Sequence, residues 1–497
     1  MRGAVFSHSM AHAAWLSAVA ALLGCSSPEL ESTNFSCTND ADCGSGQMCA
    51  DHNGDLACLP IPEVPIRIGM SAPLQGPSQA LGNEMRRGIN AMLKRVNEAG
   101  GVHGRQIVLD ALNDNYDPTM AIEMTRQLLD IQEPVEDPNR ADVRGGNGVF
   151  ALVGNVGTPT MLATAPIATK NKVVFFGPFT GAQAYLRDDT KSPYVYNYRA
   201  GYFDETAAMV EYIHKARIPS IIDQAAPDHR RIMVFAQNDS YGDSGYQGVV
   251  TAYNANVAPL PDQQAIFRIG YEREDVSSVD PAVIAAGGFL DGVLERGSTP
   301  DSRESVAIFM IDTYQPAERF IRGVKTWINM DVTRARRLDV VFLNVSFVGS
   351  DALAGALSST PESYTDVVTG DERAFTENVF VTQVVPDYQS QSAGVVQYRE
   401  DIAAFDSGAF SFTSLEGYIV ARLFTTALDM NGPNLTTDNF IKTLDTRVSA
   451  LDLGIGTELS FSSTDHQASD TVWISEIQSG GRFEVPFVWH RDSGIEN

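Results

Sequence analysis

Short apolar runs alternate with longer amphipathic runs from residue 66 onward, and this alternation constrains the fold more than any other feature of the chain. The short runs are apolar on both faces, as are strands buried on both sides of a parallel sheet. The longer runs carry apolar residues at helical spacing, as Met85, Ile89 and Met92 do. Such repeats predict an α/β fold with doubly wound parallel sheets. The expected strands are 66–70, 107–112, 149–154, 173–177, 232–236, 306–311 and 340–345.

The repeats fall into two sets that separate near Arg199, which predicts two lobes of ordinary domain size. In each set, polar or aromatic loops follow the strands at their carboxyl ends, where open α/β sheets bind ligands. Helices are expected after the Asp117–Pro118 pair, over 159–170, and after Asp204. The polar run 132–148 has no such periodicity and is expected to be an exposed loop.

The first 24 residues have the pattern of an export signal. Arg2 is the only charged side chain before residue 25, and residues 13–24 are almost entirely apolar. That run is too short to span a bilayer but suits the core of a signal peptide. The residues from Leu22 to Cys25 resemble the lipobox of bacterial lipoproteins, which implies cleavage before Cys25 and its modification with diacylglycerol. The alternative is a signal peptide that ends near a cysteine by chance; with a lipid anchor, Ser26 favours the outer membrane.

The remaining cysteines lie close together in the sequence. Four cysteines in an exported segment predict two disulfides, with three possible pairings. A zinc site is the alternative, but there is no CxxC pair and His52 is the only nearby imidazole. Residues 25–36 and the Pro-rich run 59–65 are expected to be linkers, and the module a stalk or spacer. The cysteines concerned are Cys37, Cys43, Cys49 and Cys58.

Charge and hydropathy exclude two classes of protein. Lys and Arg total 36 against 62 Asp and Glu, a formal net charge of −26. A nucleic-acid partner is therefore not expected, because binding phosphates requires clustered basic residues. No apolar run reaches the roughly 18 residues of a membrane span, so the chain is not expected to be a channel or permease, and a lipid anchor would be its only membrane contact.

Several motifs together resemble one family. They are APLQGP (72–77), NEAGGVHGR (97–105), YNYRAGYFDE (196–205), NDSYG (238–242) and SLEGYIVARLF (414–424). Over about residues 64–490 the chain resembles the type I periplasmic binding proteins, and more narrowly the branched-chain amino-acid-binding proteins that serve ABC transporters. The resemblance implies two lobes that close on a ligand, and an ABC permease as partner.

The resemblance also implies how the chain divides between the lobes. Three crossover segments would lie near Arg199, Val385 and Thr457. Hinge closure then needs only a few residues to change conformation. A monomer is expected. Lobe one would hold residues 66–200 and 386–456, and lobe two residues 201–385 and 457–497.

Lobe one carries the residues expected to hold a ligand carboxylate. Thr158 precedes Pro159 and is expected to cap a helix, and a hydroxyl-capped helix start is a natural anion site. By resemblance, the following loop contributes Thr180 and Ala182. Asp204 matches a family acid beside the ligand ammonium; its alternative role is to cap the next helix.

Lobe two is expected to contribute aromatic walls, which exclude water and give rigid apolar contact. By resemblance, Tyr241 and Tyr314 occupy these positions, although loop tyrosines are often simply surface residues. Ser346 stands where amino-acid binders of the family often carry an acid for the ligand ammonium. This departure leaves open whether the ligand is an amino acid.

Enzymatic activity is not expected. GDSG (242–245) resembles part of a serine-protease motif, but Tyr246 replaces the glycine that should follow. The chain has no G-x-S-x-G or HExxH motif, and its histidines have no metal-ligand spacing. We therefore expect no cofactor, no metal and no catalytic residue. The alternatives to transport are a ligand sensor that reports to a signalling partner and, less favoured, a hydrolase on the same fold.

The lipobox resemblance leads to a prediction about Cys25. Replacing it by serine (Cys25→Ser) removes the thiol that would be acylated, so we expect an unprocessed precursor or a soluble product. Detergent-phase partitioning of the parent and the variant measures this. A variant that enters the detergent phase like its parent would contradict lipidation at Cys25.

Overall fold

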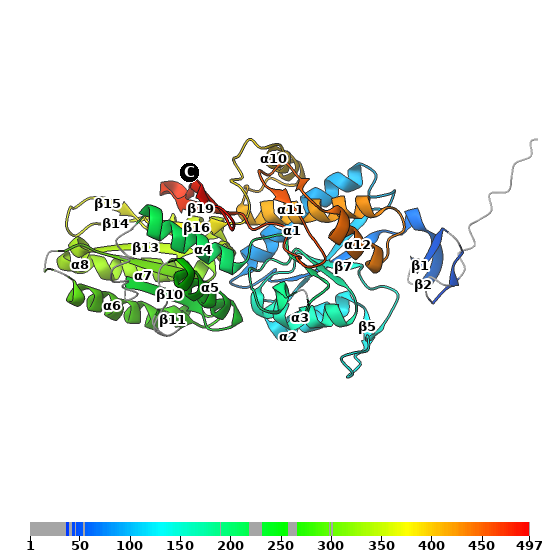
Figure 1. The fold of residues 1–497 in the computed structure, drawn as a ribbon, viewed down its shortest axis with the longest axis horizontal. Coiled ribbons are helices and arrows are strands. Elements are labelled where there is room, and N and C mark those ends of the chain that lie inside the picture. The colour runs from blue at the N-terminus through cyan, green and yellow to red at the C-terminus, as the bar shows by residue number, and fades with distance from the viewer. Residues whose placement is uncertain are drawn as a thin grey trace, which may run out of the picture.

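The computed structural model describes residues 36–496, apart from 39–41, 45, 53–54, 189, 218–230, 257–265, 298 and 300–301. The signal peptide and Cys25 lie outside the described residues. Two lobes, each built on its own sheet, lie side by side (Figure 1). The first sheet is parallel and has the order β4-β3-β7-β8-β9. Its strands are β3 (Ile66–Ala72), β4 (Ile107–Asn113), β7 (Ala151–Val153), β8 (Val174–Phe176) and β9 (Val195–Tyr196).

The second sheet has eight strands, in the order β11-β10-β12-β13-β16-β19-β20-β21. The first five are parallel, whereas the last three run antiparallel to their neighbours. The predicted parallel sheet of this lobe therefore ends in an antiparallel edge. The strands are β10 (Ile232–Gln237), β11 (Phe267–Tyr271), β12 (Glu304–Ile311), β13 (Leu338–Asn344), β16 (Val379–Gln383), β19 (Val472–Ile477), β20 (Phe483–His490) and β21 (Gly494–Glu496).

Helices cover both sheets, and the expected α/β class with two doubly wound lobes is confirmed. Around the first sheet lie α1 (Gln79–Glu98), α2 (Pro118–Leu128), α3 (Thr158–Lys170), α10 (Ala393–Phe405), α11 (Phe412–Asn431) and α12 (Thr437–Arg447). Around the second lie α4 (Tyr202–Tyr212), α5 (Ser240–Asn256), α6 (Val279–Arg296), α7 (Tyr314–Asn329), α8 (Val332–Arg337) and α9 (Ser350–Leu357).

Two local expectations were inaccurate. The loop over 132–148 contains a short hairpin, β5 (Ile131–Glu133) with β6 (Val143–Arg144). Helix α4 begins at Tyr202, two residues before Asp204, because Gly201 serves as its N-cap. By contrast the Asp117–Pro118 signal is confirmed: the Asp117 carboxylate accepts a hydrogen bond from the Met120 amide at 2.9 Å.

The chain passes three times between the sheets. It leaves the first sheet after β9, returns to it after β16 and leaves it again before β19, so α10, α11 and α12 complete the first lobe. Glycine allows α1 and α11 to cross closely: a Cβ at Gly88 would lie 1.8 Å from the Ser414 carbonyl oxygen, and one at Gly417 would lie 2.2 Å from that of Met85. The residue bounds assigned to the lobes from the sequence stay a prediction.

One described helical stretch, Val276–Arg296, is long and apolar enough by composition to cross a membrane. It includes α6, whose Val279, Leu290 and Val293 are buried in the core of the second lobe. A third of the apolar window is buried, and the core helices of water-soluble domains also meet the criterion of length and composition.

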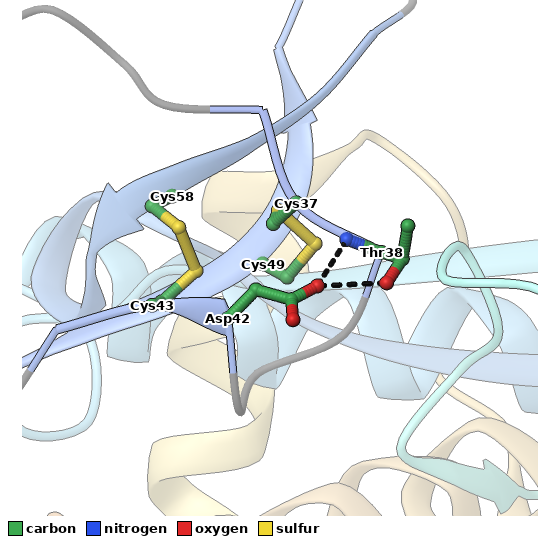
Figure 2. The surroundings of a disulfide bond; sticks show 6 residues. All are labelled: Cys37, Thr38, Asp42, Cys43, Cys49 and Cys58. Carbon is green, nitrogen blue, oxygen red and sulfur yellow. Dashed lines mark hydrogen bonds between the residues drawn. A yellow bond between two sulfur atoms is a disulfide. The ribbon is translucent and has the colours of Figure 1, made fainter.

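The cysteine module forms a hairpin of β1 (Gln47–His52) and β2 (Asp55–Pro60) at the end of the first lobe that is remote from the second lobe (Figure 1). Disulfides join Cys37 to Cys49 and Cys43 to Cys58, which settles the pairing that the sequence left open. Figure 2 shows both bridges, with the backbone amide and the hydroxyl of Thr38 donating to Asp42 at 2.7 Å. The bridges use all four thiols that a zinc site would need.

The module also contacts the first lobe. Leu56 lies against the backbone of Gly146, and the Arg105 guanidinium donates to the Val64 carbonyl oxygen at 2.8 Å. Ala57, Leu59 and Val64 are buried together in a small core separate from that of the lobes. The linker over 59–65 is therefore fixed to the lobe at its carboxyl end.

Removing the second disulfide tests how independent the module is. We expect Cys43→Ser with Cys58→Ser to destabilise the hairpin by about 3 kcal/mol, because the bridge closes a loop of 15 residues. The melting temperature of the lobes should stay unchanged, since their core is separate. Hydrogen exchange of the β1 and β2 amides, with calorimetry of the whole chain, measures both effects. A lower melting temperature of the lobes would contradict this independence.

Candidate functional site

The carboxyl ends of strands from both sheets meet where the two lobes face each other. Polar and aromatic side chains from these ends, and from the first crossover, are buried together there. The contacts between the lobes include a ring pair, Phe179 and Phe347, whose centroids are 5.2 Å apart. Within the second lobe, the ring centroids of Tyr202 and Tyr241 are 5.4 Å apart. We define the interlobe cluster as Thr158, Thr180, Arg199, Tyr202, Glu205, Tyr241, Asp312 and Ser346.

Two hydroxyls form the part of the cluster that belongs to the first lobe. The Thr158 and Thr180 hydroxyl oxygens lie 2.7 Å apart, and the Tyr202 hydroxyl lies 3.4 Å from that of Thr158. The amide of Ala182, also buried, donates to the Thr180 hydroxyl at 3.2 Å. Three residues predicted from the sequence thus lie together in the structure, namely Thr158, Thr180 and Ala182.

Thr158 starts helix α3 but is not its N-cap as expected. The N-cap is Gly157, whose φ of +107° is open to glycine but strained for other residues. The Thr158 hydroxyl is therefore free of a capping role and instead faces Thr180 and Tyr202. Because the first amides of a helix lack partners within the helix, this start still favours an anion.

The tyrosines predicted for the second lobe are both buried. Tyr241 donates its hydroxyl to the Asp312 carbonyl oxygen at 2.9 Å, and its ring packs edge-on against Phe347 at 4.8 Å. Tyr314 donates its hydroxyl to the Pro77 carbonyl oxygen, on the loop that follows β3. Tyr314 therefore spans the two lobes, whereas Tyr241 forms part of the cluster wall.

A fully buried arginine, Arg199, forms the charged part of the cluster. Its guanidinium lies 3.3 Å from a Glu205 oxygen and 3.6 Å from a Glu416 oxygen, and 4.8 Å from the Phe179 ring centroid. It also donates to the Ser346 hydroxyl. This arrangement supplies the opposite charges that a buried cation requires.

Glu205 and Glu416 differ in the hydrogen-bond donors around their carboxyl groups and in the effect of burial. Glu205 accepts hydrogen bonds from the Ser346 amide at 2.7 Å and the Thr382 hydroxyl at 2.5 Å. Burial raises the pKa of Glu416 to about 7, although the nearby Arg199 opposes the rise. Glu205 is thus held by hydrogen-bond donors, whereas burial disfavours the ionised form of Glu416 and Arg199 favours it.

Asp204 is a predicted site residue whose carboxylate lies outside the interlobe cluster. Its carboxylate pairs with Arg491 through two contacts of 2.9 Å, and accepts a hydrogen bond from Gln467 at 3.0 Å. It also accepts from the Gly201 amide at 3.0 Å, which caps α4. These partners place Asp204 at the crossovers, beside the third crossover and the carboxyl-terminal segment.

Glu205, Glu416 and Asp312 were not predicted from the sequence. The motif YNYRAGYFDE contains two adjacent acids, and only the first, Asp204, was singled out. Glu416 lies within SLEGYIVARLF, and Asp312 directly precedes the Thr313–Tyr314 pair. An acid inside an otherwise apolar helix, or directly after a buried strand, was the available signal.

Comparison with known proteins agrees with this architecture. The model of the periplasmic binding protein family matches residues 65–286. The chain is 28% identical over 115 residues to the Leu/Ile/Val-binding protein homolog 2 of Brucella abortus (strain 2308), a segment that covers 23% of this chain and 27% of that protein. The sequence match thus spans about a quarter of the length of such curated relatives.

Solved structures match over nearly the whole body of the chain. A possible leucine/isoleucine/valine-binding protein from Rhodopirellula baltica SH 1 is 30% identical, with a TM-score of 0.66 over 86% of this chain and 97% of that one. A branched-chain amino acid ABC transporter protein from Thermus thermophilus with bound valine is 13% identical, with a TM-score of 0.62 over 85% and 95%, a likeness of fold alone. The chain therefore belongs to the type I periplasmic binding proteins, in the group of the leucine/isoleucine/valine-binding proteins.

Proposed function

We propose that this chain is an extracytoplasmic solute-binding lipoprotein that captures an amino acid or a related small polar metabolite and delivers it to an ABC permease. The observation that carries the proposal is the interlobe cluster, in which paired hydroxyls of one lobe are buried against aromatic and charged groups of the other. Its family is one of substrate-binding proteins, which agrees with a binding role and no catalysis.

The first lobe would hold the solute carboxylate. Thr158 and Thr180 present two hydroxyls 2.7 Å apart beside the start of α3. Hydroxyls can donate to a carboxylate, and the helix start adds a favourable partial charge. Ala182 would line the same subsite through its backbone.

The second lobe would then close over the remainder of the solute. Tyr241 and Tyr314 would form its walls, and Ser346 would contact the solute beside Arg199. Contacts across the lobes would favour the closed form once a solute is held. Examples are the Tyr314 hydrogen bond to Pro77 and that of the Phe412 amide to Asp351 at 2.9 Å.

The relatives indicate which solutes to test. The related proteins are named for leucine, isoleucine and valine, and the Thermus thermophilus structure contains valine. In this chain the cluster is more polar than an aliphatic side chain requires, since Arg199, Glu205 and Asp312 are all buried in it. We therefore propose an amino acid without restricting it to the branched-chain ones.

The surrounding chain fits delivery at a membrane. A lipid at Cys25 would hold the protein at the periplasmic face, with the outer membrane favoured. The disulfide module lies on the end of the first lobe that is remote from the second (Figure 1), where a stalk would keep the anchor away from the moving lobe. We propose a monomer, because a single chain contains both halves of the cluster. A sensor subunit for a signalling partner is the alternative; a neighbouring permease and ATPase gene would favour transport.

Thr158 provides the test of the proposed site. We expect Thr158→Ala to weaken amino-acid binding tenfold or more, since a hydrogen bond to a charged group contributes about 1.5–3 kcal/mol and 1.4 kcal/mol corresponds to one decade. Thr158→Ser, which keeps the hydroxyl, should retain most of the affinity. Calorimetry with L-leucine, L-isoleucine, L-valine and L-glutamine measures the change.

A matched control is Thr446→Ala, which removes an exposed hydroxyl from α12 and should leave binding unchanged. If Thr158→Ala binds as tightly as the parent, the carboxylate is held elsewhere. If the parent binds none of the standard amino acids, amino-acid capture itself is wrong.

A further inference from the structure

Asp312, directly after strand β12, is a buried acid that the fold leaves without partners. Its side chain is fully buried, and neither carboxylate oxygen accepts a hydrogen bond from another residue in the described part of the chain. Its carbonyl oxygen accepts the Tyr241 hydroxyl at 2.9 Å, so the residue lies directly behind the cluster wall. Buried carboxylates without partners are rare in folded proteins.

Such an acid lowers the stability of the folded protein when no ligand is bound. Burial raises the pKa of Asp312 well above its usual value, which means that the folded protein disfavours the ionised form. Asparagine has nearly the same shape and would carry no such penalty at neutral pH. A residue that weakens the fold and lies at a ligand-binding edge of the sheet is a candidate for function.

Asp312 and Ser346 follow neighbouring strands of the same sheet, just beyond the last paired residues, and Ser346 begins a short 3-10 helix. The parallel pairing of β12 with β13 sets Met310 opposite Asn344, and two residues further along each chain come Asp312 and Ser346. Ser346 is the position where an acid for a ligand ammonium was expected and is missing. The neighbouring strand therefore supplies an acid at the same edge of the sheet.

The other acids of this region are already engaged. Glu205 is held by Ser346, Thr382 and Arg199, and Glu416 lies 3.6 Å from Arg199. Asp204 is paired with Arg491 at the crossovers. Within the described residues of the interlobe cluster, Asp312 is thus the acid whose two oxygens both lack partners.

We propose that Asp312 binds a protonated nitrogen of the bound solute. The protein would therefore bind amine-bearing acids more tightly than plain carboxylic or hydroxy acids. This inference rests on the proposed function. The carboxylate of the solute would lie against Thr158 and Thr180, and its nitrogen would point toward β12. Two nitrogens could meet Asp312, the α-ammonium or an ammonium in the side chain.

The variant Asp312→Asn, tested with amino acids and their hydroxy acid analogues, shows whether Asp312 acts on the amine of the solute. Binding of L-leucine, L-glutamine and L-lysine is measured by calorimetry, beside the 2-hydroxy acid analogue of each, in which a hydroxyl replaces the α-amine. We expect the variant to bind the amino acids at least tenfold more weakly, and to change the affinity for the hydroxy acids by less than threefold. A loss for every amino acid tested indicates the α-ammonium, whereas a loss confined to L-lysine indicates the side-chain ammonium.

Two controls separate binding from folding. Without added solute, Asp312→Asn should melt at the same temperature as the parent or higher, because folding no longer buries a carboxyl group that is ionised in the unfolded chain. Asp280→Asn removes a carboxylate of an exposed ion pair with Arg319 on the same lobe and should leave all affinities unchanged. If Asp312→Asn melts lower, Asp312→Ser, which is smaller and uncharged, is compared in its place.

The outcomes distinguish this inference from the function on which it rests. Equal affinity of parent and variant for the amino acids would overturn the role of Asp312 while leaving amino-acid capture intact. For L-leucine and L-glutamine, equal loss for the amino acid and its hydroxy acid would also overturn it, because neither hydroxy acid carries an amine. For L-lysine, equal loss would instead indicate the side-chain ammonium, which the hydroxy acid keeps. If the parent binds none of these amino acids, the proposed function fails first.

Discussion

The buried ion pairs of Arg199 are the interaction on which the arrangement of the two lobes depends. The arginine lies on the first crossover, and its partners come from α4 of the second lobe and α11 of the first. Removing one partner of a buried pair typically costs 3–5 kcal/mol, because an uncompensated charge remains. The pairs therefore fix how the crossover leaves one lobe and enters the other, and with it the positions of Phe179 and Ser346 in the cluster.

A second polar network holds the crossovers from the outside. Arg187 donates to the carbonyl oxygens of Ala182 and Arg199, at 2.7 and 3.0 Å, and to the Gln467 side chain at 2.8 Å. Gln467 in turn donates to Asp204, which Arg491 also holds. The loop that carries Thr180 is thus connected to the first and third crossovers. A change of crossover geometry on closure would reach the carboxylate subsite through these bonds, since few residues absorb a hinge motion.

The sequence predicted the class of fold because strand and helix periodicities are local signals, and the Asp117 cap shows how far such signals reach. The prediction failed where the structure depended on the direction in which a helix side chain points, or on pairing between strands far apart in the sequence. Adjacent residues of a helix point about 100° apart. The start of α4 at Tyr202 therefore decides that Glu205, rather than Asp204, faces Arg199. The antiparallel edge begins with β19, which pairs with β16 about 90 residues earlier in the chain, and no local signal exists for that pairing. Strands β20 and β21 then pair with the strands directly before them.

The cluster shows how specificity can be built against the stability of the fold. Thr158, Thr180 and Glu205 have protein hydrogen-bond partners, which hold their side chains in place in the cluster. Among the described residues Asp312 has no such partners, and its charge is favourable only when a positive group lies beside it. A site with one preorganised half and one unsatisfied acid would penalise any solute that brings no cation, because the acid would stay buried and unpaired. Selectivity for an amine would then arise because a solute without an amine leaves a buried acid unpaired. A purely apolar site around an aliphatic side chain imposes no such penalty.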